Sequence, residues 1–126
     1  MHFNHVTVMV TAVAPALAFY KMLGFRPIVL SPHYARFEAP EGDMTFSIEL
    51  TNEVAQNGAP IVYFECADLD AVCAQLEKAG VAFEARPMDQ SWLWREAHLR
   101  DPSGNRICLY WAGENRKHPP WRIADA

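Results

Sequence analysis

The sequence predicts an α+β fold built from two tandem βαβββ modules, and three observations predict it. The chain has 126 residues, 51% hydrophobic and 21% charged, which is the composition of a globular domain. A shift of 56 positions aligns the segment that begins at His5 with the segment that begins at Ile61. Both segments join β-branched and aromatic residues of strand length to apolar residues at helical spacing, and both then reach a glycine suited to a helix C-terminus.

The first module contains one predicted helix and four predicted strands. Residues 3–10 include HVTVMV and predict a strand, and Leu17 and Tyr20 belong to the apolar face of a helix over 13–23. Further strands are predicted near 25–31, 34–39 and 44–50. A turn with Pro40 and Gly42 separates the last two strands.

The second module repeats this order. Strand 60–66, helix 68–79 and strands near 81–86, 94–100 and 106–111 are predicted. A Pro-x-Gly turn at Pro102 and Gly104 corresponds to the turn in the first module. Polar residues 51–59 form a linker, and residues 112–126 form a C-terminal tail that follows neither pattern. We therefore expect a single domain over 1–126, with module one at about 3–50 and module two at about 60–111.

Alternation along the strands predicts which side chains face away from the helices. Val6, Val8 and Val10 form the helix-facing set of the first strand. The opposite face collects His5, Thr7, Met9, Tyr34, Arg36, Thr45, Ser47 and Glu49 in module one, and Trp94, Glu96, His98, Cys108 and Tyr110 in module two. So many aromatic and titratable side chains on one face indicate the lining of a small-molecule cavity, although a solvated face is the alternative.

Charge and cysteine content exclude several classes of protein. Eleven Lys and Arg against fifteen Asp and Glu give a net charge of −4, and no dense basic run predicts a nucleic-acid partner. The cysteines, Cys66, Cys73 and Cys108, are odd in number and lack CxxC spacing, which favours a reducing cytoplasm. The chain has no signal-peptide pattern and no apolar run of roughly 18–20 residues, so we expect no membrane association.

Taken together, these segments resemble the vicinal oxygen chelate superfamily, which includes glyoxalase I, bleomycin resistance proteins and extradiol dioxygenases. The resemblance covers about residues 3–111 and is carried by His5 opening HVTVMV, by AFYKMLGF at the first helix end and by RDPSGNRICLY. It implies a cupped mixed sheet whose concave face holds a divalent metal, which chelates two adjacent oxygens of a small molecule. It also implies a homodimer.

The resemblance places two of the family's four metal ligands on this chain. His5 matches the histidine of the first strand, and Glu49 within SIEL matches the glutamate of the fourth strand. In the second module the corresponding positions hold Ile61 and Cys108, or equally Tyr110, and none of these restores the usual histidine or carboxylate.

His98 is the candidate third donor, because related resistance proteins place a ligand-contacting side chain three residues before the Asp of this turn. A set of His5, Glu49 and His98 would suit iron, manganese, zinc or nickel with open coordination positions. The alternatives are a His5 hydrogen-bonded to the backbone and a Glu49 paired with Arg36.

Several other side chains are candidates for ligand binding or catalysis. Arg36 is a forked donor for a carboxylate or phosphonate, and its alternative role is a salt bridge to Glu38 or Glu96. Cys108 is a zinc ligand, a nucleophile or an apolar filler. The candidate set is completed by Tyr63, Trp94 and Tyr110 for ligand binding, by Trp92 as a stacking residue beside the cavity or beneath the tail, and by Glu49 and Glu96 for proton transfer.

Two functions follow from these expectations. The first is a metal-dependent lyase, isomerase or dioxygenase that acts on a small molecule with vicinal oxygens. The second is a metal-free protein of the bleomycin resistance type, which sequesters a planar ligand between aromatic side chains.

Overall fold

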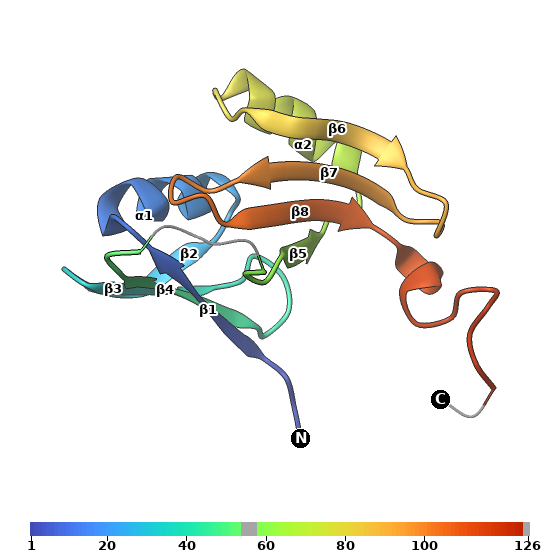
Figure 1. Cartoon of the computed structure of the whole chain (residues 1–126), viewed down its shortest axis with the longest axis horizontal. Helices are drawn as coiled ribbons and strands as arrows, with labels where there is room; N and C mark the ends of the chain where they lie inside the picture. The colour runs from blue at the N-terminus through green and yellow to red at the C-terminus, as the bar shows by residue number, and fades with distance from the viewer. Residues whose placement is uncertain (54–57, 125–126) are drawn as a thin grey trace. The chain divides into compact units, whose positions relative to one another are not determined.

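The computed structural model describes residues 1–53 and 58–124 and contains both predicted βαβββ modules (Figure 1). The elements are β1 (His5–Val10), α1 (Val13–Met22), β2 (Arg26–Ser31), β3 (Tyr34–Glu38), β4 (Thr45–Leu50), β5 (Val62–Glu65), α2 (Leu69–Lys78), β6 (Phe83–Asp89), β7 (Arg95–Arg100), β8 (Arg106–Trp111) and the 3₁₀ helix η1 (Gly113–Arg116). The predicted α+β fold is confirmed. Residues 54–57 of the predicted linker lie outside the described residues.

Each module forms its own four-stranded mixed sheet. The first sheet has the order β1-β4-β3-β2 and the second has the order β5-β8-β7-β6. In both, the first and last strands of the module lie side by side and run parallel, and the remaining pairs that are described are antiparallel. The chain divides into a first unit of Met1–Pro60 with Arg100–Asn105, and a second unit of Ile61–Leu99 with Arg106–Ala126.

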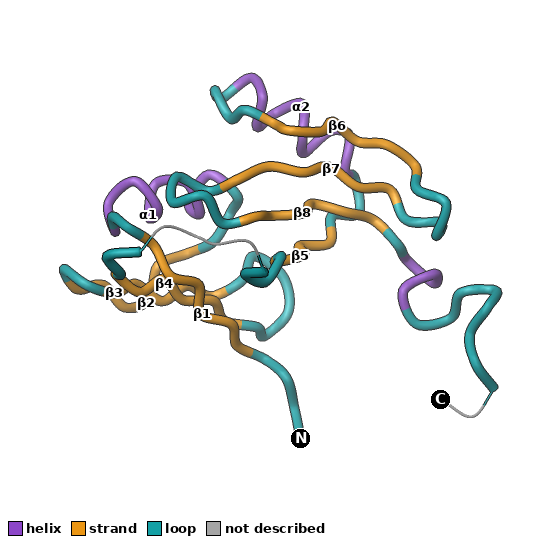
Figure 2. Tube along the Cα trace, in the orientation of Figure 1, coloured by secondary structure: helices purple, strands orange, loops and turns teal. Residues whose placement is uncertain are grey.

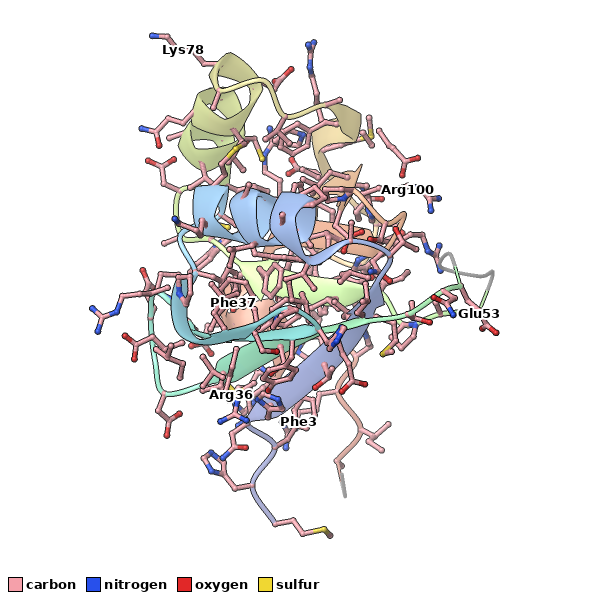
Figure 3. The ribbon with its side chains drawn as sticks, turned by 90° about the vertical axis from the view of Figure 1, so that its left-hand side faces the viewer. Phe3, Arg36, Phe37, Glu53, Lys78 and Arg100 are labelled. Carbon is pink, nitrogen blue, oxygen red and sulfur yellow. The ribbon has the colours of Figure 1, made fainter. Side chains whose placement is uncertain are left out.

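Four aromatic rings form the centre of the first unit's core. Tyr20 of α1 lies with its ring centroid 4.8 Å from that of Phe46 and 6.0 Å from that of Phe37, and Phe25 contacts the same group. This packing fixes one face of β3 and β4 toward α1, so the alternate residues lie on the other face. Figure 3 shows the labelled neighbours Arg36 and Phe37 on opposite sides of the sheet.

The turn between β7 and β8 belongs to the first unit and centres on a buried carboxylate. Asp101 accepts hydrogen bonds from the Tyr20 hydroxyl at 2.7 Å, from the backbone N–H groups of Ser103 and Asn105, and from Asn105 Nδ2. Asn105 Nδ2 also donates to the Met9 carbonyl at 2.7 Å. The predicted turn therefore links strand β1 to helix α1 through hydrogen bonds.

Helix α2 covers one face of the second sheet. Leu69, Cys73 and Leu76 are its buried side chains, and Ala97, Leu99, Ile107 and Leu109 are the buried alternate residues of β7 and β8. Strand β6 extends to Asp89, three residues beyond the predicted end near 86. None of the helices in the described ranges is long and apolar enough to cross a membrane.

The tail after β8 begins with a short helix that the sequence pattern did not predict. Figure 2 shows η1 directly after the last strand. The Glu65 carboxylate accepts the backbone N–H groups of Ala112 and Gly113 at 2.9 and 3.0 Å. A side chain of β5 thereby fixes the point at which the tail leaves the sheet.

Candidate functional site

A cluster of three potential metal ligands lies on the second sheet, on the face that alternation turns away from α2. His98 Nε2 is 2.9 Å from Glu96 Oε1 and 4.0 Å from Cys108 Sγ. The three ligand atoms all lie within 4.8 Å of one another. Glu96 and Cys108 are buried and His98 is half-buried, so His98 is the most accessible of the three. Glu96 and His98 come from β7 and Cys108 from β8, which are neighbours in the sheet.

The environment of the cluster keeps the Cys108 thiol protonated in the absence of a metal. Burial, followed by the negative charge of Glu96 and a hydrogen bond to it, raises the pKa of Cys108 to about 12. A thiol with such a pKa is a poor nucleophile at neutral pH. A divalent cation would reverse this effect, because metal coordination displaces the thiol proton.

The loop between β6 and β7 places an indole donor beside Oε2 of Glu96, the carboxylate oxygen that His98 does not contact. Trp92 Nε1 donates to Glu96 Oε2 at 2.7 Å. The loop is closed by Gln90, whose N–H donates to the Trp94 carbonyl, and it contains Leu93 at a φ of 68°. A left-handed conformation is uncommon for a leucine and indicates that the tight turn is held by its surroundings. Both oxygens of Glu96 thus have hydrogen-bond partners.

Three aromatic residues lie beside this cluster. Trp94 and Tyr110 are stacked with ring centroids 4.9 Å apart, and Tyr63 meets both edge-on at 6.0 and 5.4 Å. The buried residues Cys108 and Tyr110 belong to one apolar cluster, against which Trp94 packs. Tyr63 is 42% exposed and offers an accessible ring surface. The Trp94 indole N–H donates to the Asn115 carbonyl of η1, so the tail fixes this ring.

On the first sheet, a chain of side-chain hydrogen bonds runs across the face opposite α1. Arg36 Nε donates to the Tyr34 hydroxyl at 2.9 Å, and that hydroxyl is 2.6 Å from Ser47 Oγ. Ser47 Oγ is 3.0 Å from His5 Nε2, and His5 Nδ1 is 2.6 Å from Thr45 Oγ1. We call these five residues the first-unit chain. Both ring nitrogens of His5 are engaged in it.

The strand register separates the two predicted metal ligands of the first unit. His5 pairs with Thr45, whereas Glu49 pairs with Met9 on β1 and with Tyr34 on β3. Four residues along a strand correspond to about 13 Å. His5 and Glu49 are therefore offset along the paired strands rather than directly opposite each other. His98, the third predicted ligand, belongs to the second unit.

The expected ion pairs of Arg36 do not form. Glu38 pairs with Arg26 at 2.9 Å, and Glu96 is bound by His98 and Trp92. Arg36 lies over the Tyr34 ring instead, with its Cζ 5.5 Å from the centroid. Within the described ranges no carboxylate pairs with the Arg36 guanidinium.

Each member of this three-residue cluster was a candidate from the sequence, but the sequence did not indicate that the three lie together. The sequence predicts Glu96 for proton transfer, His98 as a ligand in a different set, and Cys108 as a ligand-binding residue, a zinc ligand, a nucleophile or an apolar filler. Alternation along the strands predicted that all three side chains lie on one face of the sheet. Their proximity follows only from the strand order, in which β7 and β8 are neighbours. Ser47 was placed on the correct face without any role being predicted, because serine is common on strands that face water.

Comparisons with known proteins agree with this architecture. Residues 2–109 match the family model described as Glyoxalase/Bleomycin resistance protein/Dioxygenase superfamily. None of the curated protein sequences compared matches the chain.

Solved structures with similar folds include proteins of two kinds. A lactoylglutathione lyase from Agrobacterium tumefaciens superimposes with a TM-score of 0.72 at 17% identity, covering 87% of this chain and 92% of that protein. A bleomycin-binding protein complexed with bleomycin gives a TM-score of 0.68 at 19% identity, covering 88% and 98%. A superfamily member from Sphaerobacter thermophilus gives 0.73 at 22% identity, covering 88% and 97%. At these identities the likeness concerns the fold alone. Because the family model spans most of the sequence, the chain belongs to the glyoxalase, bleomycin resistance protein and dioxygenase superfamily.

Proposed function

We propose that the protein binds a small molecule through a divalent metal held by Glu96, His98 and Cys108. One observation carries the proposal: a carboxylate oxygen, an imidazole nitrogen and a thiol sulfur, from three side chains, lie within 4.8 Å of one another. His98 Nε2 faces both of the other ligand atoms, so an ion between the three would need only short side-chain movements. The more usual pair, His5 and Glu49, lies outside this proposed site.

The chemistry of the three donors favours zinc over the other metals expected for the family. A thiolate and an imidazole suit zinc, whereas iron and manganese favour oxygen-rich sets. Three protein ligands leave a position open on a four-coordinate ion, as in catalytic zinc sites. When bound, the ion would supply a Lewis acid that binds and polarises the oxygens of a ligand.

The other residues of this face position the ligands and receive the small molecule. The Trp92 indole holds one oxygen of Glu96, which directs the other oxygen toward His98. The rings of Tyr63, Trp94 and Tyr110 supply a wall for a planar or apolar part of the molecule. This arrangement supports binding of a molecule with adjacent oxygens on a flat skeleton.

Zinc content of the purified protein tests the proposal directly. We expect about one zinc per chain after expression in zinc-supplemented medium, measured by mass spectrometry of the metal. His98→Ala and Cys108→Ser should lose it. His5→Ala and Cys73→Ser serve as matched controls, because neither residue belongs to the cluster, and both should retain it. A folded wild-type protein without zinc, or a zinc content unaffected by Cys108→Ser, would contradict the proposal.

The second candidate is metal-free sequestration of a planar ligand, which the aromatic residues favour. The stacked Trp94 and Tyr110 pair and the exposed Tyr63 ring offer surface for stacking without any ion. Bleomycin, the ligand in one structural relative, is a suitable first probe. Quenching of tryptophan emission that persists in excess chelator and is lost in Tyr63→Ala would favour this candidate over the first.

We also propose a homodimer in a reducing compartment. Edge strand β2 exposes Ile28, Val29 and Leu30, and exposed apolar edges favour pairing with a second chain. None of the three cysteines forms a disulfide in the part of the chain that the structure describes. Light scattering after gel filtration tests the dimer. A monomeric wild type, or a Leu30→Lys variant that remains fully dimeric, would contradict pairing through β2.

A further inference from the structure

The first-unit chain is a connected set of hydrogen bonds that the proposed metal site does not use. It joins β3, β4 and β1 through Arg36, Tyr34, Ser47, His5 and Thr45 in that order. Ser47 is fully buried, whereas Arg36 is exposed at the outer end of the chain. The buried Ser47 hydroxyl links the Tyr34 phenol to the His5 imidazole. When this hydroxyl donates to one of them it accepts from the other, so a change of hydrogen-bond direction at Tyr34 also changes the direction at His5.

The exposed end of the chain has the donors needed for an anion. Arg36 Nε donates a hydrogen bond to the Tyr34 hydroxyl, and the Arg36 guanidinium lies over the Tyr34 ring. These two contacts fix the plane of the guanidinium. Its two Nη groups have no hydrogen-bond partner among residues 1–53 and 58–124, so their N–H donors are available to a carboxylate. One of the Nη groups directs an N–H to the same side as Nε–H, so a carboxylate oxygen on that N–H would lie beside the Tyr34 hydroxyl.

The hydrogen bonds can run in either of two directions. In the inward direction, Tyr34 donates to Ser47, Ser47 donates to His5 Nε2, and His5 Nδ1–H donates to Thr45. In the outward direction, Thr45 donates to His5 Nδ1, His5 Nε2–H donates to Ser47, and Ser47 donates to Tyr34. Only the outward direction leaves the Tyr34 hydrogen available for a ligand. The two directions require different tautomers of the neutral His5 ring.

We infer that the first unit binds a carboxylate on Arg36 and Tyr34. Binding switches the hydrogen bonds of the first-unit chain from the inward to the outward direction and thereby changes the tautomer of His5. Without a ligand, the Arg36 donor polarises the phenol and makes Tyr34 the better donor to Ser47, which favours the inward direction. A bound carboxylate is a stronger acceptor than a serine hydroxyl and attracts the phenol hydrogen. No net proton transfer is required, since the imidazole exchanges its proton with water.

The charges around Tyr34 agree with this role. Desolvation acts to raise the pKa of Tyr34, but the hydrogen bonds with Ser47 and Arg36 and the charge of Arg36 outweigh it, so the pKa is lowered. Glu49, which faces Tyr34 from β4, opposes this effect. Glu38 on the same strand is paired with Arg26 and leaves Arg36 available.

Nitrogen NMR of the histidine rings tests the inference with benzoate as the probe. The five histidines are labelled with ¹⁵N, and His5 is assigned from the His5→Gln variant. We expect His5 to be mainly the Nδ1–H tautomer in the free protein and mainly the Nε2–H tautomer at saturating benzoate. Benzamide, which has the same ring and no charge, should produce no change.

Three variants separate benzoate binding from the change in hydrogen-bond direction within the first-unit chain. Arg36→Gln should weaken benzoate binding by at least about tenfold. Arg26→Gln is the matched control, because Arg26 is an exposed arginine on the neighbouring strand β2, and this variant should bind benzoate as the wild type does. Ser47→Ala should still bind benzoate, but its His5 ring should no longer respond. Failure of the wild type to bind benzoate, an unchanged His5 tautomer at saturation, or an equal response in Ser47→Ala would overturn the inference.

Discussion

Two buried carboxylates, those of Glu96 and Asp101, are held by hydrogen bonds from neighbouring groups. Glu96 is 3% exposed, and its two oxygens are bound by Trp92 and His98. Asp101 is 4% exposed and accepts four hydrogen bonds. A buried carboxylate is tolerated only when its charge is balanced by such donors. Removal of a donor should therefore have a measurable effect at either residue.

Trp92→Phe tests the role of the indole at the proposed metal site. The variant keeps an aromatic ring but removes the N–H that orients Glu96, and loss of such an outer hydrogen bond lowers metal affinity by about tenfold or more. Competition with a chromogenic zinc chelator measures the affinity. Trp94→Phe is the control, because its indole donates to the Asn115 carbonyl instead. Equal zinc affinities in the two variants would show that Trp92 does not support the site.

The Tyr20–Asp101 hydrogen bond allows a similar test of stability. Asp101→Ala leaves the buried Tyr20 hydroxyl and several turn donors without an acceptor, which we expect to cost about 3 kcal/mol. Tyr20→Phe removes one hydrogen bond and leaves three on the carboxylate, at a cost of about 1 kcal/mol. Urea unfolding of both variants and of the double variant gives the coupling energy. Additive losses would mean that the two groups do not interact.

At the scale of helices and strands, the repeat and the periodicity predicted the fold closely. In β3 the alternating residues Ala35 and Phe37 identified the core face of the strand, because burial of one face imposes a period of two. Glycines marked the ends of both helices, since Gly24 and Gly80 adopt a φ of 99° that other residues rarely reach.

The register of the strands was not accessible from the sequence. The resemblance named His5 and Glu49 as metal ligands without a register, and the register places Thr45 opposite His5. Register depends on the packing of all paired residues and on the turn length, so a motif of a few residues does not determine it. Helix η1 was missed because four residues are too few to show a period.

Helix α2 carries a thiol whose ionisation couples stability to pH. Burial, followed by neighbouring Cys66 and acidic residues, raises the pKa of Cys73 from 9.0 to about 11. A raised pKa favours the neutral form in the folded state, so the stabilisation is complete below about pH 9 and is lost as the pH rises toward about 11. Two pKa units correspond to about 2–3 kcal/mol.

Urea unfolding across this pH range should show the effect as a difference between proteins. We expect the stability of the wild type to fall relative to that of Cys73→Ala between about pH 9 and pH 11. Below pH 9 the difference between the two should be constant and should reflect only the lost packing of the thiol. A constant difference over the whole range would contradict a buried neutral Cys73.

At the scale of the whole molecule, the two repeated units carry different chemistry on equivalent faces. The first unit has a chain of hydroxyl, imidazole and guanidinium groups, with both nitrogens of His5 engaged. The second unit has Ile61 at the position that corresponds to His5, together with a thiol, an imidazole and a carboxylate on β7 and β8. The repeated fold thus presents different polar groups on equivalent faces of its two units, and the metal ligands are proposed in the second unit, which departs further from the family pattern.

The absorption spectrum of the cobalt-loaded protein tests this central claim most directly. Cobalt(II) replaces zinc in tetrahedral sites, and a cysteine ligand gives an intense thiolate-to-metal band in the near ultraviolet. We expect this band in the wild type and in His5→Ala, and we expect Cys108→Ser to lose it while remaining folded by circular dichroism. A band that survives in Cys108→Ser, or that disappears in His5→Ala, would contradict a metal site built from Glu96, His98 and Cys108.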